Sequence, residues 1–185
     1  NDFYAHAGDA FTLSNQIVFY NEDIKNNPIQ LKHPYDGMCN ISFLKENVQA
    51  YLNEDYYINY TNNNDVVVTK YSDGKTEANC WPLPVEFSWT GTSASYTLNI
   101  SKSPDMSNPI TYTTSNTSID VYNLFPATEY FWQVTDSSSN KSAVFTFITA
   151  VNQPHQIYAE GVNNLRDAGG VKTIEGAKIK TGLLY

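Results

Sequence analysis

Few residues of this chain could do chemistry, and the most informative is its single arginine, Arg166. A planar guanidinium can hold a phosphate group through two parallel hydrogen bonds. Asp167 follows directly in the sequence. The more common arrangement of such neighbours is a structural ion pair, which contributes little to stability. Both interpretations remain open for Arg166 and Asp167.

The other reactive side chains lack the spacing of known sites. The histidines His6, His33 and His155 lie far apart without carboxylates at ligand spacing, so we assign no metal. No nucleophile-elbow or Walker-type sequence occurs. Cys39 and Cys80 could form a disulfide, whose loop of about 40 residues would stabilise the fold by roughly 4 kcal/mol. The alternative is two unpaired thiols that act as small core residues.

The composition is that of a folded, acidic protein. Charged residues make up 16% of the chain and aromatic residues 14%, so core material is ample. The formal net charge of −8 and the pI near 4.7 repel phosphate backbones and anionic lipid headgroups. We therefore expect neither nucleic acid nor a membrane surface as a partner. No apolar stretch approaches the roughly 20 residues that a membrane span needs.

Residues 82–150 have the pattern of an antiparallel β-sandwich. Short runs rich in β-branched and aromatic residues recur there at intervals of about ten residues, separated by turn-forming clusters. Val85, Phe87 and Trp89 alternate with polar residues, which predicts a strand with one apolar face. The strands are expected near residues 85–89, 96–100, 110–114, 119–121, 130–134 and 144–148.

The segment Leu124-Phe-Pro126-Ala-Thr128-Glu-Tyr130 resembles the tyrosine corner of fibronectin type III domains. Trp89 stands where such domains place their core tryptophan. The resemblance implies that Trp89 and Tyr130 are buried in one core, with the Tyr130 hydroxyl bonded to backbone upstream of it. The alternative is a proline-containing loop before an ordinary strand. Modules of this kind space, display or bind, and the fold alone does not decide which.

Residues 1–81 are expected to form a β-rich accessory region. The segment from Ile29 to Gly37 resembles the opening strand of a fibronectin-like module, in which case Cys39 to Cys80 would bracket an insertion. The other expected elements are strands over Phe11–Tyr20, Tyr56–Tyr60 and Asp65–Tyr71, and a short helix over Leu44–Leu52 capped by Ser42.

The sandwich pattern stops after Ala150, and residues 151–161, which include Pro154, are predicted to be a linker. Residues 162–185 then resemble the entry to the catalytic domain of bacterial tyrosine phosphatases. These secreted, dual-specificity-like enzymes open with an Asn-x-Arg-Asp-x-Gly-Gly motif, a hairpin and a Gly-Leu-Leu-Tyr strand. The matching residues are Asn164, Arg166, Asp167, Gly169, Gly170 and Gly182-Leu183-Leu184-Tyr185.

This second resemblance implies the first hairpin of an α/β phosphatase domain, with its turn around Glu175-Gly176. It also makes Arg166 or Asp167 the candidate substrate-binding residue, at the border of a phosphotyrosine site. Ala168 departs from the Leu or Val that is usual at its position, and the Arg-Ser that ordinarily follows the motif's tyrosine is not present. The alternative is that the two glycines, Gly169 and Gly170, only serve a turn with positive φ.

Catalysis in this phosphatase family needs a Cys thiolate with an arginine about six residues further on. Lys45 and Glu86 stand six positions after Cys39 and Cys80. We therefore expect no catalytic residue in this chain. The nucleophile of a phosphatase would lie beyond Tyr185, in a continuation of the polypeptide or in a second chain.

Two functions follow from the sequence. The first is the N-terminal portion of a secreted or surface bacterial phosphatase, which would hydrolyse phosphotyrosine and other phosphomonoesters without a cofactor. The second is a non-catalytic extracellular module whose aromatic side chains, such as Trp81, contact glycan or protein. The Arg-Asp-Ala-Gly-Gly segment favours the first, because a binding module has no need for it.

Overall fold

The computed structural model describes residues 27–45, 81–151, 153–162, 165–170, 173–177 and 179–185. Several sequence predictions fall outside these residues. They concern the strands Phe11–Tyr20, Tyr56–Tyr60 and Asp65–Tyr71, the Leu44–Leu52 helix beyond Lys45, Cys80 and Asn164.

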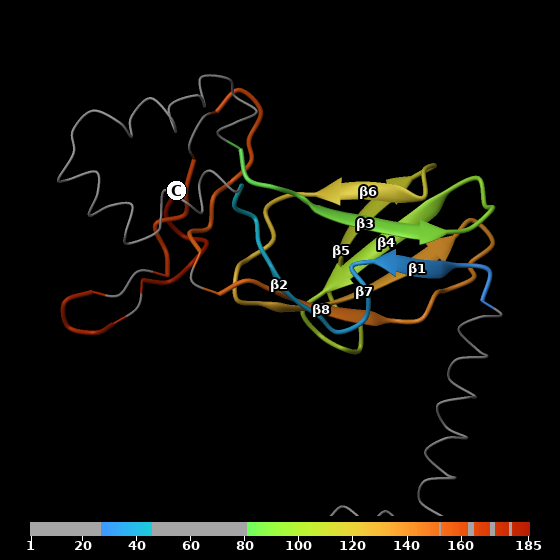
Figure 1. The fold of residues 1–185 in the computed structure, drawn as a ribbon, viewed down its shortest axis with the longest axis horizontal. Helices are drawn as coiled ribbons and strands as arrows, with labels where there is room; N and C mark the ends of the chain where they lie inside the picture. Colours follow the sequence, from blue (N-terminus) through green and yellow to red (C-terminus); the bar gives the residue numbers. More distant parts are fainter. Residues whose placement is uncertain (1–26, 46–80, 152, 163–164, 171–172, 178) are drawn as a thin grey trace, which may run out of the picture. The chain divides into compact units, whose positions relative to one another are not determined.

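The described residues form eight β-strands and no helix, which confirms the mainly β prediction. The strands lie in two sheets, one in the order β1-β3-β6 and the other in the order β2-β8-β7-β4-β5 (Figure 1). Their bounds are β1 Gln30–His33, β2 Met38–Ile41, β3 Val85–Thr90, β4 Tyr96–Ser101, β5 Ile110–Thr114, β6 Ser118–Val121, β7 Glu129–Asp136 and β8 Phe145–Thr149.

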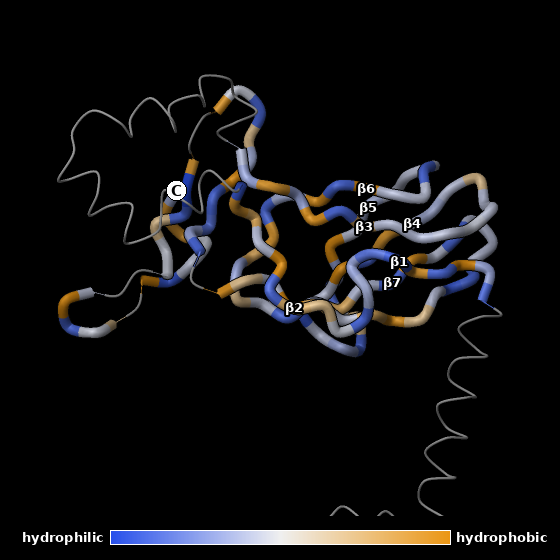
Figure 2. The backbone as a smooth tube through the Cα atoms, viewed as in Figure 1, coloured by the Kyte–Doolittle hydropathy of each residue, from blue (hydrophilic) through white to orange (hydrophobic). Residues whose placement is uncertain are grey.

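Alternation of apolar and polar residues explains why β3, β4 and β7 form where the sequence predicts strands. In β3, Val85, Phe87 and Trp89 are buried, and the residues between them are more exposed. Apolar stretches of the chain are accordingly interrupted by hydrophilic ones (Figure 2). Such a period of two suits a strand that packs on one face and is solvated on the other.

Strand β4 holds its sheet together through two antiparallel ladders. It pairs with β7 from Tyr96 opposite Asp136 to Ser101 opposite Phe131. On its other side it pairs with β5 in an unbroken register.

Strands β1 and β2 come from the region that the sequence assigns to an accessory domain. β1 pairs antiparallel with β3, and β2 pairs parallel with β8. Residues 30–33 and 38–41 therefore belong to the two sheets.

The chain divides into two compact units. The first contains the described residues up to Asp36, together with Phe87–Ile119 and Tyr130–Thr146. Trp89 and Tyr130 are both buried in it, which confirms that part of the prediction. Edge-to-face ring contacts join Trp89 to Tyr96 and Phe87 to Trp132, and such pairs add to the energy of burial. The hydrogen bond of the Tyr130 hydroxyl stays a prediction.

The second unit contains the described residues of Gly37–Glu86 and Phe147–Tyr185, together with Asp120–Glu129. Thr149 of β8 is fully buried, and its hydroxyl donates to the Phe125 carbonyl at 2.7 Å. The Thr149 hydroxyl oxygen also accepts a hydrogen bond from the Thr128 N–H at 3.0 Å. The proline-containing segment before β7 is thereby tied to β8. The buried apolar side chains of the second unit include Ile41, Phe43, Val85, Val121, Leu124 and Phe147.

Truncation of the central tryptophan tests the core of the first unit. Trp89→Ala should lower the free energy of unfolding by roughly 3 to 5 kcal/mol, because it removes a buried ring and leaves a cavity. Tyr130→Phe should cost about 1 kcal/mol, the net worth of a typical hydrogen bond. Urea denaturation followed by circular dichroism measures both. Thr113→Ala, on the exposed side of β5, should change stability by less than about 0.5 kcal/mol.

Candidate functional site

The candidate site is the segment that carries the phosphatase-like motif, residues 165–170 and 179–185. Backbone hydrogen bonds bring its two halves together, from Ala168 N–H to the Leu184 carbonyl and from Gly170 N–H to the Ile179 carbonyl, each at 2.8 Å. Between them, Thr173 N–H donates to the Ala177 carbonyl at 2.7 Å. A turn thus lies at the predicted Glu175-Gly176 position.

No strand is assigned in the described part of residues 165–185 apart from an isolated bridge at Arg166. The backbone bonds there are single, whereas a strand requires a continuous ladder with a neighbour. The α/β hairpin of the sequence interpretation therefore stays a prediction.

Asp167 connects the two halves of the motif through its side chain. Its Oδ1 accepts the Gly169 N–H at 2.8 Å, and its Oδ2 accepts the Gly182 N–H at 2.7 Å. Oδ2 also lies 3.1 Å from Nδ1 of His155. We call these four residues, Asp167, Gly169, Gly182 and His155, the Asp167 cluster. Asp167 is only 6% exposed, so its carboxylate is a structural acceptor in this arrangement.

Opposing effects act on the pKa of Asp167. Burial raises it, since a charged carboxylate loses hydration. Hydrogen bonds from the Gly169 N–H, from His155 and from the Gly182 N–H lower it and outweigh burial, so the pKa lies below its ordinary value of 3.8. Asp167 is therefore ionised at neutral pH.

Both motif glycines are required by the backbone. A Cβ on Gly169 would lie 2.3 Å from Cα of Thr181, a distance at which backbone would have to move. Gly170 has φ of +85°, in the left-handed region that favours glycine. The predicted turn with positive φ is thus present at Gly170, while Gly169 serves close approach.

His155 is the member of the Asp167 cluster that the sequence did not reveal. It falls in the predicted 151–161 linker, yet it is only 4% exposed, and its ring centroid lies 4.8 Å from that of Phe125. Its Nε2 has no hydrogen-bond partner in the part of the chain that the structure describes. The sequence carries no signal for it, because the burial of His155 is visible only in the structure.

Tyr158, in the predicted linker, makes contacts with residues distant in the sequence. Residue Tyr158 exchanges two hydrogen bonds with the Asn123 side chain, at 2.7 Å to its backbone N–H and 3.0 Å to its carbonyl. Its ring stacks on Tyr122 at 4.2 Å and meets Trp81 edge to face at 4.8 Å. Part of the ring of Trp81, the candidate glycan contact, is therefore in contact with Tyr158. The polar composition of residues 151–161 predicted a linker and gave no sign of the aromatic contacts of Tyr158.

Arg166 is exposed and lies opposite Gln156 in an antiparallel bridge. Asp167, its neighbour in sequence, pairs with His155. Adjacent residues of an extended segment point to opposite sides, which explains why one is exposed and the other buried.

Of the two cysteines predicted to form a disulfide, the structure describes only Cys39. Cys39 is an exposed free thiol whose Sγ donates to the Gly37 carbonyl at 3.3 Å. Cys80 lies outside the described residues, so a bridge to it stays a prediction. Among the described residues there is no group of three metal-ligating side chains and no helix long and apolar enough to cross a membrane.

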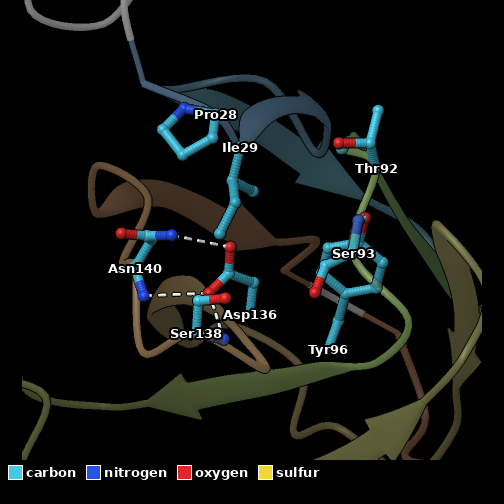
Figure 3. Close-up of a pocket in the computed structure, with 9 residues that line it drawn as sticks. Pro28, Ile29, Thr92, Ser93, Tyr96, Asp136, Ser138 and Asn140 are labelled. Carbon is cyan, nitrogen blue, oxygen red and sulfur yellow. Dashed lines mark hydrogen bonds between the residues drawn. The ribbon is translucent and has the colours of Figure 1, made fainter.

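A separate pocket lies in the first unit, where the β3–β4 and β7–β8 loops meet the chain before β1 (Figure 3). Its volume is about 250 Å³. Asp136 accepts hydrogen bonds there from the N–H groups of Ser138 and Asn140 and from the Asn140 side chain. The Asn140 side chain makes the largest contribution to lowering the pKa of Asp136. The pocket is lined by Pro28, Ile29, Gly91, Thr92, Ser93, Tyr96, Asp136, Ser138 and Asn140.

Comparison of the chain with protein-family models, with curated proteins and with solved structures gives no match. The site's interpretation therefore depends on its own geometry.

Neutralising the buried carboxylate should loosen the motif. Asp167→Asn replaces an acceptor by an amide whose NH₂ would face the Gly182 or Gly169 N–H, so we expect a loss of about 1–3 kcal/mol of stability. Urea denaturation measures the loss. The exposed carboxylate of Glu160 provides the matched control, and Glu160→Gln should change stability by less than about 0.5 kcal/mol. An equal effect of the two substitutions would contradict the structural role of Asp167.

Acid should remove the contribution of Asp167. Because its pKa is lower in the folded state, the carboxylate stabilises the fold fully above about pH 5, and this contribution disappears as the pH falls through the folded pKa. The stability difference between the natural chain and Asp167→Asn should therefore be constant from pH 7 to about pH 5 and shrink below that. Thermal melts over this pH range measure it. A difference that persisted undiminished at the lowest pH would oppose the assignment.

Proposed function

We propose that this chain is the N-terminal portion of a secreted or surface protein-tyrosine phosphatase. The observation that carries the proposal is the Asp167 cluster. Asp167, Gly169 and Gly182, three residues quoted for the phosphatase resemblance, meet in one set of hydrogen bonds. These hydrogen bonds join the first part of the quoted motif to its last part, which supports the proposal.

In the proposed enzyme a cysteine thiolate beyond Tyr185 attacks the phosphorus of a phosphotyrosine. The S–P bond forms as the P–O bond to the tyrosyl oxygen breaks, and the leaving oxygen takes a proton. Water then attacks the phosphocysteine, which releases inorganic phosphate and restores the thiolate. The reaction needs no cofactor.

Arg166 would border the phosphate site in this enzyme. Its side chain is exposed, and a guanidinium matches the geometry of phosphoryl oxygens. Asp167 would act on the frame and not on the substrate, since it is buried and its oxygens already accept backbone N–H groups. An ionised carboxylate would in any case repel a phosphate.

The two sheets would belong to a fibronectin type III-like module that displays or orients the catalytic domain. Three observations support this identity: the two-sheet arrangement, the buried Trp89, and the ordered Leu124–Tyr130 corner tied to Thr149. The fold of such a module does not determine what the module binds.

The catalytic domain would lie against the apolar end of the motif. Leu183, Leu184 and Tyr185 are 69%, 61% and 60% exposed. Consecutive exposed apolar residues are typical of a surface that another element covers. In this proposal that element is the phosphatase domain, whether it follows in the same polypeptide or is a second chain.

A second candidate function is supported by the pocket of Figure 3. It is polar and is formed by loops at one end of the sandwich, where sandwich modules commonly bind their ligands. A binding module would use this end and would show no turnover.

Phosphatase assays separate the two candidates. The polypeptide that contains the catalytic domain should hydrolyse p-nitrophenyl phosphate, and Arg166→Ala should lower its kcat/KM by about 10- to 100-fold through loss of charge-assisted hydrogen bonds. Lys32→Ala, an exposed cation of β1, is the control and should leave kcat/KM unchanged. The 185-residue chain alone should be inactive. Activity of this chain that survived Arg166→Ala, Cys39→Ser and Cys80→Ser together would reveal a different chemistry.

A further inference from the structure

Arg166 is held on both sides by the segment that precedes it. Ile157 N–H donates to the Leu165 carbonyl and Asp167 N–H donates to the His155 carbonyl, each at 2.9 Å. These two bonds flank the bridge between Gln156 and Arg166. The backbone of residues 155–157 therefore determines where the Cα of Arg166 lies.

The His155 side chain contacts the side chain of Asp167, the residue that follows Arg166. Its Nδ1 lies 3.1 Å from Asp167 Oδ2, and the two side chains are 3% and 0% exposed. Because Asp167 is ionised, its oxygens only accept hydrogen bonds. Nδ1 must then carry the proton, and in the neutral ring Nε2 is left as a bare acceptor, consistent with its lack of a partner among the described residues. Leaving an acceptor unpaired is more easily tolerated in proteins than leaving an N–H unpaired.

His155 is thus held by one strong hydrogen bond and by its contact with Phe125. The same Phe125 ring would contact a Cβ placed on Gly182, at 3.3 Å from its Cζ. One aromatic side chain accordingly packs beside both the histidine and the glycine whose N–H donates to Asp167. The contacts of His155 converge on the turn that follows Arg166.

We propose that His155 is a positioning residue, which acts through Asp167 to hold the Arg166–Gly170 turn and the Gly182 backbone in one geometry. The proposal rests on the proposed function for its catalytic meaning, because it assigns to a residue outside the motif the placement of the phosphate-binding arginine. Its structural content stands independently. Without the ring, the Asp167 carboxylate loses a donor and the restraint on its rotamer, so the Gly169 and Gly182 N–H bonds open more often.

Amide hydrogen exchange of the 185-residue chain tests this directly. His155→Asn places an amide N–H where Nδ1 stood and should retain protection of Gly169 and Gly182 within about twofold of the natural chain. His155→Phe keeps a ring without a donor, and His155→Gln places its amide at the Nε2 position. In both, exchange at Gly169 and Gly182 should be faster by about tenfold or more, the effect of losing a hydrogen bond to a charged group. His33→Gln in β1 is the control, and it should leave these two amides unchanged.

A ¹⁵N NMR measurement on the natural chain should show the His155 proton on Nδ1 and not on Nε2. The Nε2–H tautomer, or undiminished protection in both His155→Gln and His155→Phe, would overturn the proposal. If His155→Phe does not fold, the Asn and Gln pair gives the same contrast.

The enzymatic consequence is measured in the polypeptide that carries the phosphatase domain. Its kcat/KM should fall by about tenfold in His155→Gln and recover in His155→Asn. A natural polypeptide without phosphatase activity would refute the proposed function alone, since the exchange result still decides the role of His155. Full activity of His155→Gln with accelerated exchange would refute the catalytic consequence of the positioning role, and would leave the structural role of His155 and the proposed function intact.

Discussion

The carboxylate of Asp167 imposes the main constraint on the C-terminal part of this protein. Removing a carboxylate from water costs several kcal/mol unless its oxygens are hydrogen-bonded. Asp167 meets this requirement with two backbone N–H groups and one imidazole, taken from three separate segments of the chain. The segments must therefore assemble together. The requirement also explains Gly169, since a side chain there would collide with the backbone at Thr181.

The sandwich is held by a different kind of interaction. Its interior is apolar and aromatic, and the energy of burial is non-directional and proportional to area. Trp89 and Trp132 illustrate the balance, because each has a buried indole N–H without a partner among the described residues. Burial of two large rings and their edge-to-face contacts offsets the loss of those hydrogen bonds. Hydrogen bonds contribute where the segment before β7 meets β8, as in the two bonds that the Thr149 hydroxyl makes with Phe125 and Thr128.

Arg166 and Asp167 show how neighbouring charges can take opposite roles. In sequence they form an obvious pair, and a surface ion pair is the ordinary expectation. Arg166 lies opposite Gln156 in an antiparallel bridge, whereas the side chain of Asp167 pairs with His155. Arg166 is exposed, and Asp167 is buried.

The sequence by itself determined the sandwich strands, because burial of one face imposes a period of two that is visible in residues such as Val85, Phe87 and Trp89. It also indicated the turn at Gly170, since positive φ selects glycine. It did not reveal His155, the packing of the linker on Asn123 and Tyr122, or the burial of Asp167. Each of these depends on contacts between residues that are distant in the chain, and the composition of a short polar segment carries no record of what it packs against. Only the tertiary structure decided which of two adjacent charged residues is buried among hydrogen-bond donors and which is exposed.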